Sequence, residues 1–140
     1  MKAIFFHKAK NEKRSGSNVS AFLWKARLKS FVYAWEGIVS FIRSEHNAQI
    51  HLTATVLVLV LSVTLRLSQS ESIAVVFSIA LVWVTEMVNT AIEKAMDLVS
   101  REKHPQIKMV KDVAAGAVLV AAIAAAIVGC IVFIPKLVVL

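Results

Sequence analysis

Residues 86–97, EMVNTAIEKAMD, place a set of polar side chains on one face of a helix. At about 100° per residue, the members of this acidic face fall within roughly a quarter turn of one another. They are Glu86, Asn89, Thr90, Glu93 and Asp97. The preceding residues 72–84 are almost wholly apolar and continue into the segment without Gly or Pro. Carboxylates at membrane depth cost about 2.5 kcal/mol or more, so they are rare and usually functional. The acidic face is therefore the predicted functional site.

Grouped carboxylates suit a hard cation such as Mg²⁺, which prefers one or two carboxylates plus phosphate oxygens. Glu45, at the cytoplasmic end of the first apolar segment, and Glu93 are the predicted pair for this ion. Lys111 would supply a point charge for phosphate. Glu86 lies at the depth of a lipid headgroup, which makes it a candidate general base toward a lipid hydroxyl. Together these residues predict phosphoryl transfer from a metal nucleotide to a membrane alcohol.

Two other interpretations of the acidic face remain open at this stage. The sequence contains no GxxxxGK[ST] loop, GxGxxG motif or zinc motif. An ion- or proton-coupled transporter would use intramembrane carboxylates in a similar way, although transporters usually contain broken helices or internal repeats, and this sequence has neither. A purely structural role, with hydrogen bonds between membrane helices, would need fewer aligned polar groups.

The rest of the chain predicts an all-α integral membrane protein. Hydrophobic residues make up 58% of its 140 residues, above the 45–50% that is typical of soluble domains. Its apolar segments predict three spans, and the stripe pattern before them predicts an amphipathic helix on the membrane surface. The predicted elements are a basic tail at 1–20, a surface helix at 21–43, spans at 46–66, 72–98 and 111–134, and a loop at 100–110. Residues 21–140 are expected to form one domain.

The basic residues predict how the chain crosses the membrane. Of sixteen Lys and Arg residues, nine lie at or before Arg43 and five lie between Lys94 and Lys111. The positive-inside tendency then places the N-terminus and the loop at 100–110 in the cytoplasm and the C-terminus outside. The net charge of +7 is thus explained by topology and anionic lipid, and we expect no nucleic-acid partner.

Four segments resemble the prokaryotic diacylglycerol kinases and their undecaprenol kinase relatives. They are RLKSFVYAWEGI at 27–38, the segment around Glu45, EMVNTAIEKAMD, and HPQIKMVKDVAAGAVLV at 104–120. The resemblance implies a homotrimer of three-span subunits in the bacterial cytoplasmic membrane, each with an N-terminal surface helix. It also implies transfer of the γ-phosphate of ATP, with Mg²⁺, to a lipid alcohol. NTAIE and QIH are more similar to the undecaprenol kinase branch, but the site residues leave diacylglycerol and undecaprenol both open.

The resemblance implies a role for each matching residue. Glu86 matches the catalytic base of the family, and Glu45 and Glu93 match its metal-binding glutamates. The other active-site candidates are Asn89, Asp97 and Arg27, the last matched only approximately. The nucleotide-binding candidates are Tyr33, Glu45, Glu93, Glu102, Lys103, His104, Lys111 and Asp112, with Lys103 standing where the enterobacterial type has tyrosine. The lipid-binding candidates are Asn47, Ala48, Gln49, Ile50, His51 and Glu86.

Overall fold

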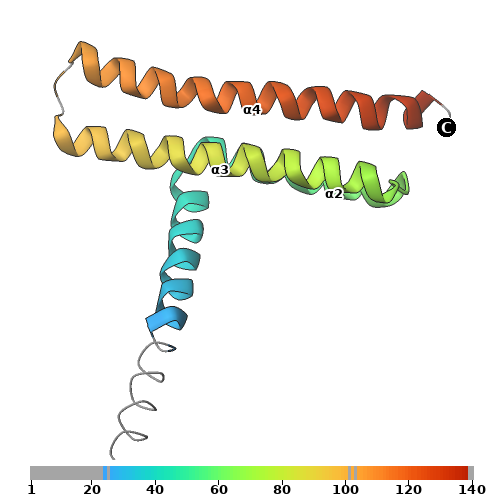
Figure 1. The fold of residues 1–140 in the computed structure, drawn as a ribbon, viewed down its shortest axis with the longest axis horizontal. Coiled ribbons are helices and arrows are strands. Elements are labelled where there is room, and N and C mark those ends of the chain that lie inside the picture. The colour runs from blue at the N-terminus through green and yellow to red at the C-terminus, as the bar shows by residue number, and fades with distance from the viewer. Residues whose placement is uncertain (1–23, 25, 101, 103, 139–140) are drawn as a thin grey trace, which may run out of the picture. The chain divides into compact units, whose positions relative to one another are not determined.

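The chain folds into helices joined by short connections (Figure 1). A computed structural model describes residues 24, 26–100, 102 and 104–138. Residues 26–44 are helical, and three longer helices follow: α2 (His46–Thr64), α3 (Gln69–Val99) and α4 (Pro105–Val138). The predicted tail at 1–20 and the first residues of the predicted surface helix lie outside the described part. The chain divides into two compact units, residues 1–40 and 41–140, and each is described by itself.

The helix at 26–44 exposes large apolar side chains along its length. Leu28, Phe31 and Trp35 each leave more than half of their surface uncovered. The charged residues Lys29 and Glu36 directly follow Leu28 and Trp35 in sequence. A helix with Trp and Phe on one side and charged residues on another is typical of the headgroup region of a membrane. Its position on the membrane surface stays a prediction.

The three long helices are each long and apolar enough to cross a membrane. In α3 the usual distribution of polar and apolar residues is inverted. Glu86 and Asn89 are buried, while Val84 and Val88 are 58% and 53% exposed. Exposed apolar surface is unfavourable in water by about 25 cal/mol per Å², whereas lipid chains accept it. These helices confirm the predicted all-helical class with three long apolar candidate spans.

Helix α3 is the central element of the unit at 41–140. Helix α4 lies beside α3 along most of its length, and α2 packs on α3. A cluster of buried apolar residues, Val75, Val132 and Phe133, joins the start of α3 to the end of α4. Val58 and Leu61 of α2 pack against the same cluster. The apolar core therefore lies toward the end of α3 that is away from the acidic face.

The start of α3 is held by a capping box. Ser68 Oγ accepts from the Glu71 backbone N–H at 3.4 Å, and Glu71 Oε2 accepts from the Ser68 backbone N–H at 2.6 Å. The same carboxylate oxygen lies 3.1 Å from Lys136 Nζ at the end of α4. Two orphan N–H donors are thus satisfied at once, which fixes where the helix begins. The helix starts three residues before the predicted boundary at residue 72.

The preceding turn closes α2 with a Schellman motif. Leu67 N–H donates to the Ser62 carbonyl at 3.2 Å, and Arg66 N–H donates to the Val63 carbonyl at 3.2 Å. Arg66 has a φ of 48°, which is the left-handed conformation that this motif requires at its C′ position. Glycine usually occupies that position. The turn between α2 and α3 is consequently short.

The predicted loop at 100–110 is wrong for residues 105–110, because α4 begins at Pro105. Proline is favoured at the first helical position, where its missing N–H would have no intrahelical partner. His104 Nδ1 accepts from the Gln106 backbone N–H at 3.3 Å and so satisfies a donor of the first turn. The connection between α3 and α4 is therefore only Ser100–His104. At its other end α4 continues to Val138, past the predicted boundary at 134.

Ser68→Ala is expected to lower the free energy of unfolding by about 1 kcal/mol, because an N-cap hydroxyl contributes about this much. Thermal unfolding of the purified protein, followed by circular dichroism, measures the effect. Ser30→Ala is the matched control, since the Ser30 hydroxyl donates only to the Ala26 carbonyl within its own helix. An equal loss in both variants would contradict a specific role for the cap.

Candidate active site

The acidic face of α3 runs from buried to exposed along the helix. Among the residues that the structure describes, the buried polar side chains are Glu86, Asn89 and Thr90. Glu93 is half-buried, and Asp97 is exposed. From Glu86 to Asp97 the helix rises about 16 Å, at 1.5 Å per residue. The face therefore connects a protected carboxylate with groups that water can reach.

Asn89 links two parts of this face and keeps one atom unpaired. Its Nδ2 donates to Glu93 Oε1 at 3.2 Å. Its Oδ1 is buried and has no hydrogen-bond partner among the described residues. An unpaired buried acceptor costs about 1–3 kcal/mol. Such a cost is consistent with a site whose missing partner is a ligand.

Glu45 lies at the start of α2 and is paired with α3. It is the N-cap residue of α2, but its side chain does not cap the helix. Glu45 Oε1 instead lies 2.8 Å from Lys94 Nζ and accepts from Ser44 Oγ at 3.1 Å. The Lys94 ammonium holds the pKa of the Glu45 carboxyl below its usual range. Desolvation raises this pKa by less than Lys94 lowers it, and the hydrogen bond from Ser44 lowers it slightly further. Glu45 is therefore ionised at neutral pH, as a metal ligand must be.

A cleft of about 630 Å³ lies where α3 ends and α4 begins. Five of the residues predicted from the sequence line it together: Asp97, Glu102, His104, Lys111 and Asp112. Lys111 forms an ion pair with Asp97, and Lys108 forms one with Asp112. The volume is within the 300–1,000 Å³ that small-molecule sites usually have. The cleft combines cationic, acidic and apolar groups, as a nucleotide would require.

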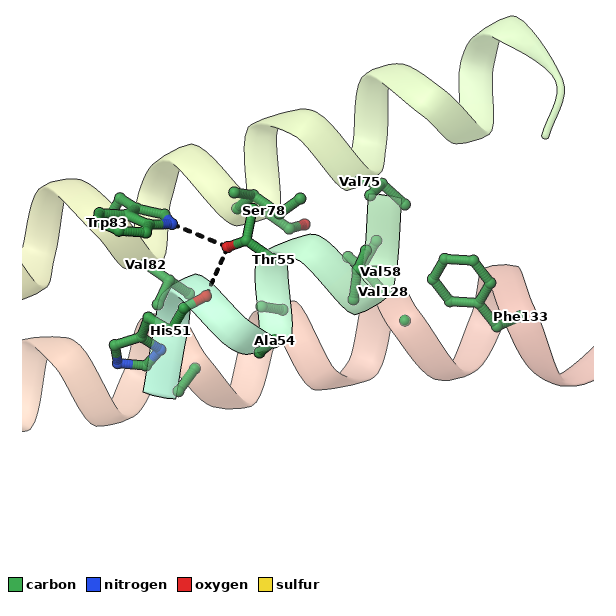
Figure 2. Close-up of a pocket in the computed structure, with 14 residues that line it drawn as sticks. His51, Ala54, Thr55, Val58, Val75, Ser78, Val82, Trp83, Val128 and Phe133 are labelled. Carbon is green, nitrogen blue, oxygen red and sulfur yellow. Dashed lines mark hydrogen bonds between the residues drawn. The ribbon is translucent and has the colours of Figure 1, made fainter. Parts of the chain in front are cut away.

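A second cavity, of about 190 Å³, lies among α2, α3 and α4 (Figure 2). Its walls are mostly apolar, with Val58, Val75 and Phe133 facing it. Two of its polar side chains are hydrogen-bonded to each other: Trp83 Nε1 donates to Thr55 Oγ1 at 3.0 Å, and Thr55 Oγ1 donates to the His51 carbonyl at 2.7 Å. An apolar cavity of about 150 Å³ can stay dry and bind a molecule the size of benzene. This cavity can therefore accept a short piece of hydrocarbon.

Trp83 lies between this cavity and the acidic face. It lines the cavity and precedes Glu86 by three residues, which is less than one helical turn. Its ring also packs edge to face on Phe41, with ring centroids 6.1 Å apart. The indole is thus held by both a hydrogen bond and an aromatic contact. Sequence analysis missed Trp83 and Thr55, although the position of Trp83 one turn from Glu86 was a visible signal.

Comparison with protein families identifies the chain. Residues 32–133 match the family model described as prokaryotic diacylglycerol kinase. The chain belongs to the prokaryotic diacylglycerol kinase family. It is therefore an ATP-dependent lipid kinase, and its long apolar helices are those of a membrane enzyme.

Two curated relatives of the family are similar over most of this chain. The undecaprenol kinase of Bacillus subtilis (strain 168) is 41% identical over 109 residues, which cover 78% of this chain and 89% of the relative. The diacylglycerol kinase of a Synechocystis species is 40% identical over 112 residues, covering 79% of this chain and 63% of that relative. Membership of the prokaryotic diacylglycerol kinase family thus agrees with the predicted lipid kinase and removes the basis for a transporter.

Several predicted residues are not among those that the structure places in these sites. Tyr33 and Arg27 belong to the unit at 1–40, which is described by itself, and Lys103 lies outside the described residues. Of the predicted lipid-binding residues in this lipid kinase, Asn47, Gln49 and Ile50 are exposed at the start of α2. Ala48 is fully buried, so its side chain packs inside the chain and not against lipid. His51 lines the cavity of Figure 2.

The oxygen ligands that this kinase offers, Glu45 and Glu93, fit Mg²⁺, which needs only one or two carboxylates from the protein. The described residues contain no group of three or more His, Cys, Asp or Glu side chains that could hold a metal ion. Mg²⁺ is usually bound by one or two carboxylates plus substrate phosphates. Glu45 and Glu93 would supply the carboxylates, and Asn89 Oδ1 is an unpaired oxygen beside Glu93.

Proposed function

We propose that the kinase transfers the γ-phosphate of ATP to the hydroxyl of a membrane polyprenol such as undecaprenol, with Glu86 as the general base. The observation that carries this proposal is the burial gradient of the acidic face. Glu86 is 3% exposed and lies in an apolar span, while the cleft lined by Asp97 and Lys111 lies at the far end of the same face. A base that is shielded from water favours a lipid hydroxyl over water as the acceptor.

The proposed step is a direct displacement at phosphorus. The lipid hydroxyl gives its proton to the Glu86 carboxylate as its oxygen bonds to the γ-phosphorus. The bond from the γ-phosphorus to the bridging oxygen breaks, and ADP leaves with that electron pair. Bound Mg²⁺ would neutralise charge on the β- and γ-phosphates. Lys111 and His104 are assigned to hold one end of the nucleotide in the cleft, so that its triphosphate would extend along the acidic face past Glu93 toward Glu86.

The cavity of Figure 2 supports a role for the lipid chain in the same proposal. A lipid whose hydroxyl lies at Glu86 extends its hydrocarbon toward the middle of the bilayer. Trp83 and Val82 of α3 line the cavity and precede Glu86 by three and four residues, which is about one helical turn. Because its walls are mostly apolar and Trp83, Thr55 and Ser78 are already hydrogen-bonded within the protein, the cavity favours an isoprenoid or acyl segment over water.

Filling the cavity is expected to weaken binding of the lipid and leave ATP binding unchanged. Ala125 lines the cavity from α4, and Ala125→Phe adds a ring of about the size that the cavity holds. We expect the KM for the lipid to rise about tenfold and the KM for ATP to stay constant, as measured in mixed micelles. Ala126→Phe is the matched control, because the neighbouring Ala126 is exposed. An equal KM for the lipid in both variants would contradict the assignment.

The choice of acceptor has its own test. The relative that this chain covers to 89% of its length is named undecaprenol kinase, and this coverage supports a polyprenol. Purified protein is given ATP, Mg²⁺ and either undecaprenol or diacylglycerol in the same lipid background. We expect kcat/KM to be at least tenfold higher for undecaprenol, which is about 1.4 kcal/mol in the transition state. A tenfold preference for diacylglycerol would reverse this part of the proposal.

The proposal includes a homotrimer with the N-terminus in the cytoplasm and the C-terminus outside. The resemblance to the family supports the trimer, and the distribution of Lys and Arg supports the orientation. The unpaired Asn89 Oδ1 is compatible with a site completed by a neighbouring subunit or by substrate. Chemical crosslinking in native membranes tests the subunit number, and labelling of single cysteines introduced at each end tests the orientation.

A further inference from the structure

Lys94 is a basic residue that pairs with Glu45, one of the two carboxylates assigned to the metal. The proposed mechanism gives it no role. It follows Glu93 in sequence. Its Nζ lies 2.8 Å from Glu45 Oε1 and donates to Ser44 Oγ at 3.4 Å. The pair joins the start of α2 to α3 across 49 residues of sequence. The carboxylate assigned to a divalent cation is thus already neutralised by an ammonium of the same chain.

The exposure of the two side chains shows that this contact is easily exchanged. The Lys94 side chain is 58% exposed and the Glu45 side chain 28% exposed. Exposed ion pairs contribute little to stability, because their attraction is screened and two flexible side chains must be ordered. A lysine on a flexible four-carbon stem can leave such a contact without any change in the helices. Fold stability alone is therefore a weak reason for this pair.

We propose that Lys94 is an internal competitor for the divalent cation, with its ammonium occupying Glu45 until cation and nucleotide arrive together. The inference rests on the proposed function, which assigns Glu45 and Glu93 to the metal. Two cations cannot share one carboxylate oxygen closely without strong repulsion, so the ammonium must leave before a metal ion binds Glu45 Oε1. Lys94 thus controls when the divalent cation can bind Glu45.

The same geometry explains why the nucleotide should assist this exchange. A bare cation must displace Lys94 from Glu45 and leave the ammonium without a carboxylate partner. A metal nucleotide also brings phosphate oxygens, which are good acceptors for a lysine ammonium. The displaced Lys94 then has a new partner within reach of its stem. Competition by Lys94 should therefore oppose the bare cation more than the metal nucleotide.

The test measures binding of Mn²⁺, a paramagnetic substitute for Mg²⁺, to the purified full-length protein by electron paramagnetic resonance. We expect Lys94→Gln to tighten binding of bare Mn²⁺ about three- to tenfold and binding of Mn²⁺ with a non-hydrolysable nucleotide by less. Lys136→Gln is the matched control, because it removes the ammonium from the Lys136–Glu71 ion pair outside the site. In a Glu45→Gln background, Lys94→Gln should have no effect on bare Mn²⁺.

Four outcomes would overturn the inference. An unchanged Mn²⁺ affinity in Lys94→Gln, with or without a lower melting temperature, would make the pair a structural contact only. Weaker binding of the metal nucleotide, together with no tighter binding of bare Mn²⁺, would make Lys94 a phosphate ligand and not a competitor for the cation. An equal effect in Lys136→Gln would show a general effect of net charge. If Glu45→Gln and the unaltered protein bind Mn²⁺ equally, the metal assignment itself fails, and lipid phosphorylation tests the kinase function separately.

Discussion

Glu86→Gln is expected to lower kcat about a thousandfold, while the protein stays folded and still binds Mg-nucleotide. General bases typically contribute 10²–10⁴ in rate, and the amide cannot accept the proton of the lipid hydroxyl. Nucleotide binding should persist, because the cleft that contains Asp97 and Lys111 lies about 16 Å along α3 from Glu86. Transfer of labelled phosphate to undecaprenol gives kcat, and fluorescence of a labelled nucleotide gives its affinity.

Glu71→Gln is the matched control for this result. It makes the same change of side chain on the same helix, at the end away from the acidic face, and glutamine can still form the capping box. We expect this variant to keep near-normal turnover. If Glu86→Gln also kept near-normal turnover, the assignment of Glu86 as the base would be rejected.

Asn89→Leu is expected to lower activity by 10- to 100-fold without lowering the melting temperature. Residues that orient metal ligands typically have effects of this size on affinity or activity, and Asn89 Nδ2 holds Glu93 at 3.2 Å. The substitution also removes the unpaired Oδ1, whose burial costs about 1–3 kcal/mol. This gain offsets the lost hydrogen bond. Activity and thermal unfolding of the same preparation, without ligands, provide the comparison.

The control for Asn89 is Thr85→Val, because the Thr85 hydroxyl donates only to carbonyls of its own helix, those of Leu81 and Val82. We expect Thr85→Val to change neither property strongly. A parallel loss of activity and melting temperature in Asn89→Leu would show instead that Asn89 is a structural residue. Restored activity at high Mg²⁺ would support its role in orienting Glu93.

Hydrophobic length and helical period were enough to predict the class of fold and the three candidate spans. The helix ends were less predictable, because their signals are local and small. Ser68 and Glu71 form a capping box at the start of α3. Because Glu71 is charged, the predicted span began only after it. Pro105 lies at the first helical position of α4, although proline is also common in loops. In both places hydrogen bonds of the first turn determine where the helix begins, and a hydropathy pattern gives no information about these bonds.

The acidic face was predictable because its polar residues recur at the helical period next to a long apolar segment. A period of 3.6 residues aligned Glu86 with Glu93 regardless of which other helices were present, and the apolar flanks indicated its depth. The cleft residue Lys111 was predicted as a point charge for phosphate, and the resemblance to a family added Asp112. Contacts between helices were not predictable in this way. The Lys94–Glu45 pair and the burial of Ala48 depend on the rotation of α2 relative to α3, which the pattern of a single helix does not determine.

The capped start of α3 also fixes the distance between Ser68 and Glu86. Helix α3 runs from Gln69 to Val99 without interruption, so Glu86 lies about 27 Å from the cap residue Ser68, at 1.5 Å per residue. The hydrocarbon core of a typical bilayer is about 30 Å thick. In the proposed orientation, the uninterrupted helix fixes the distance between the outer membrane boundary at Ser68 and the carboxylate of Glu86. If Glu86 is the base, membrane thickness should influence catalysis directly, because a thicker or thinner bilayer shifts the level at which the lipid hydroxyl lies relative to the carboxylate.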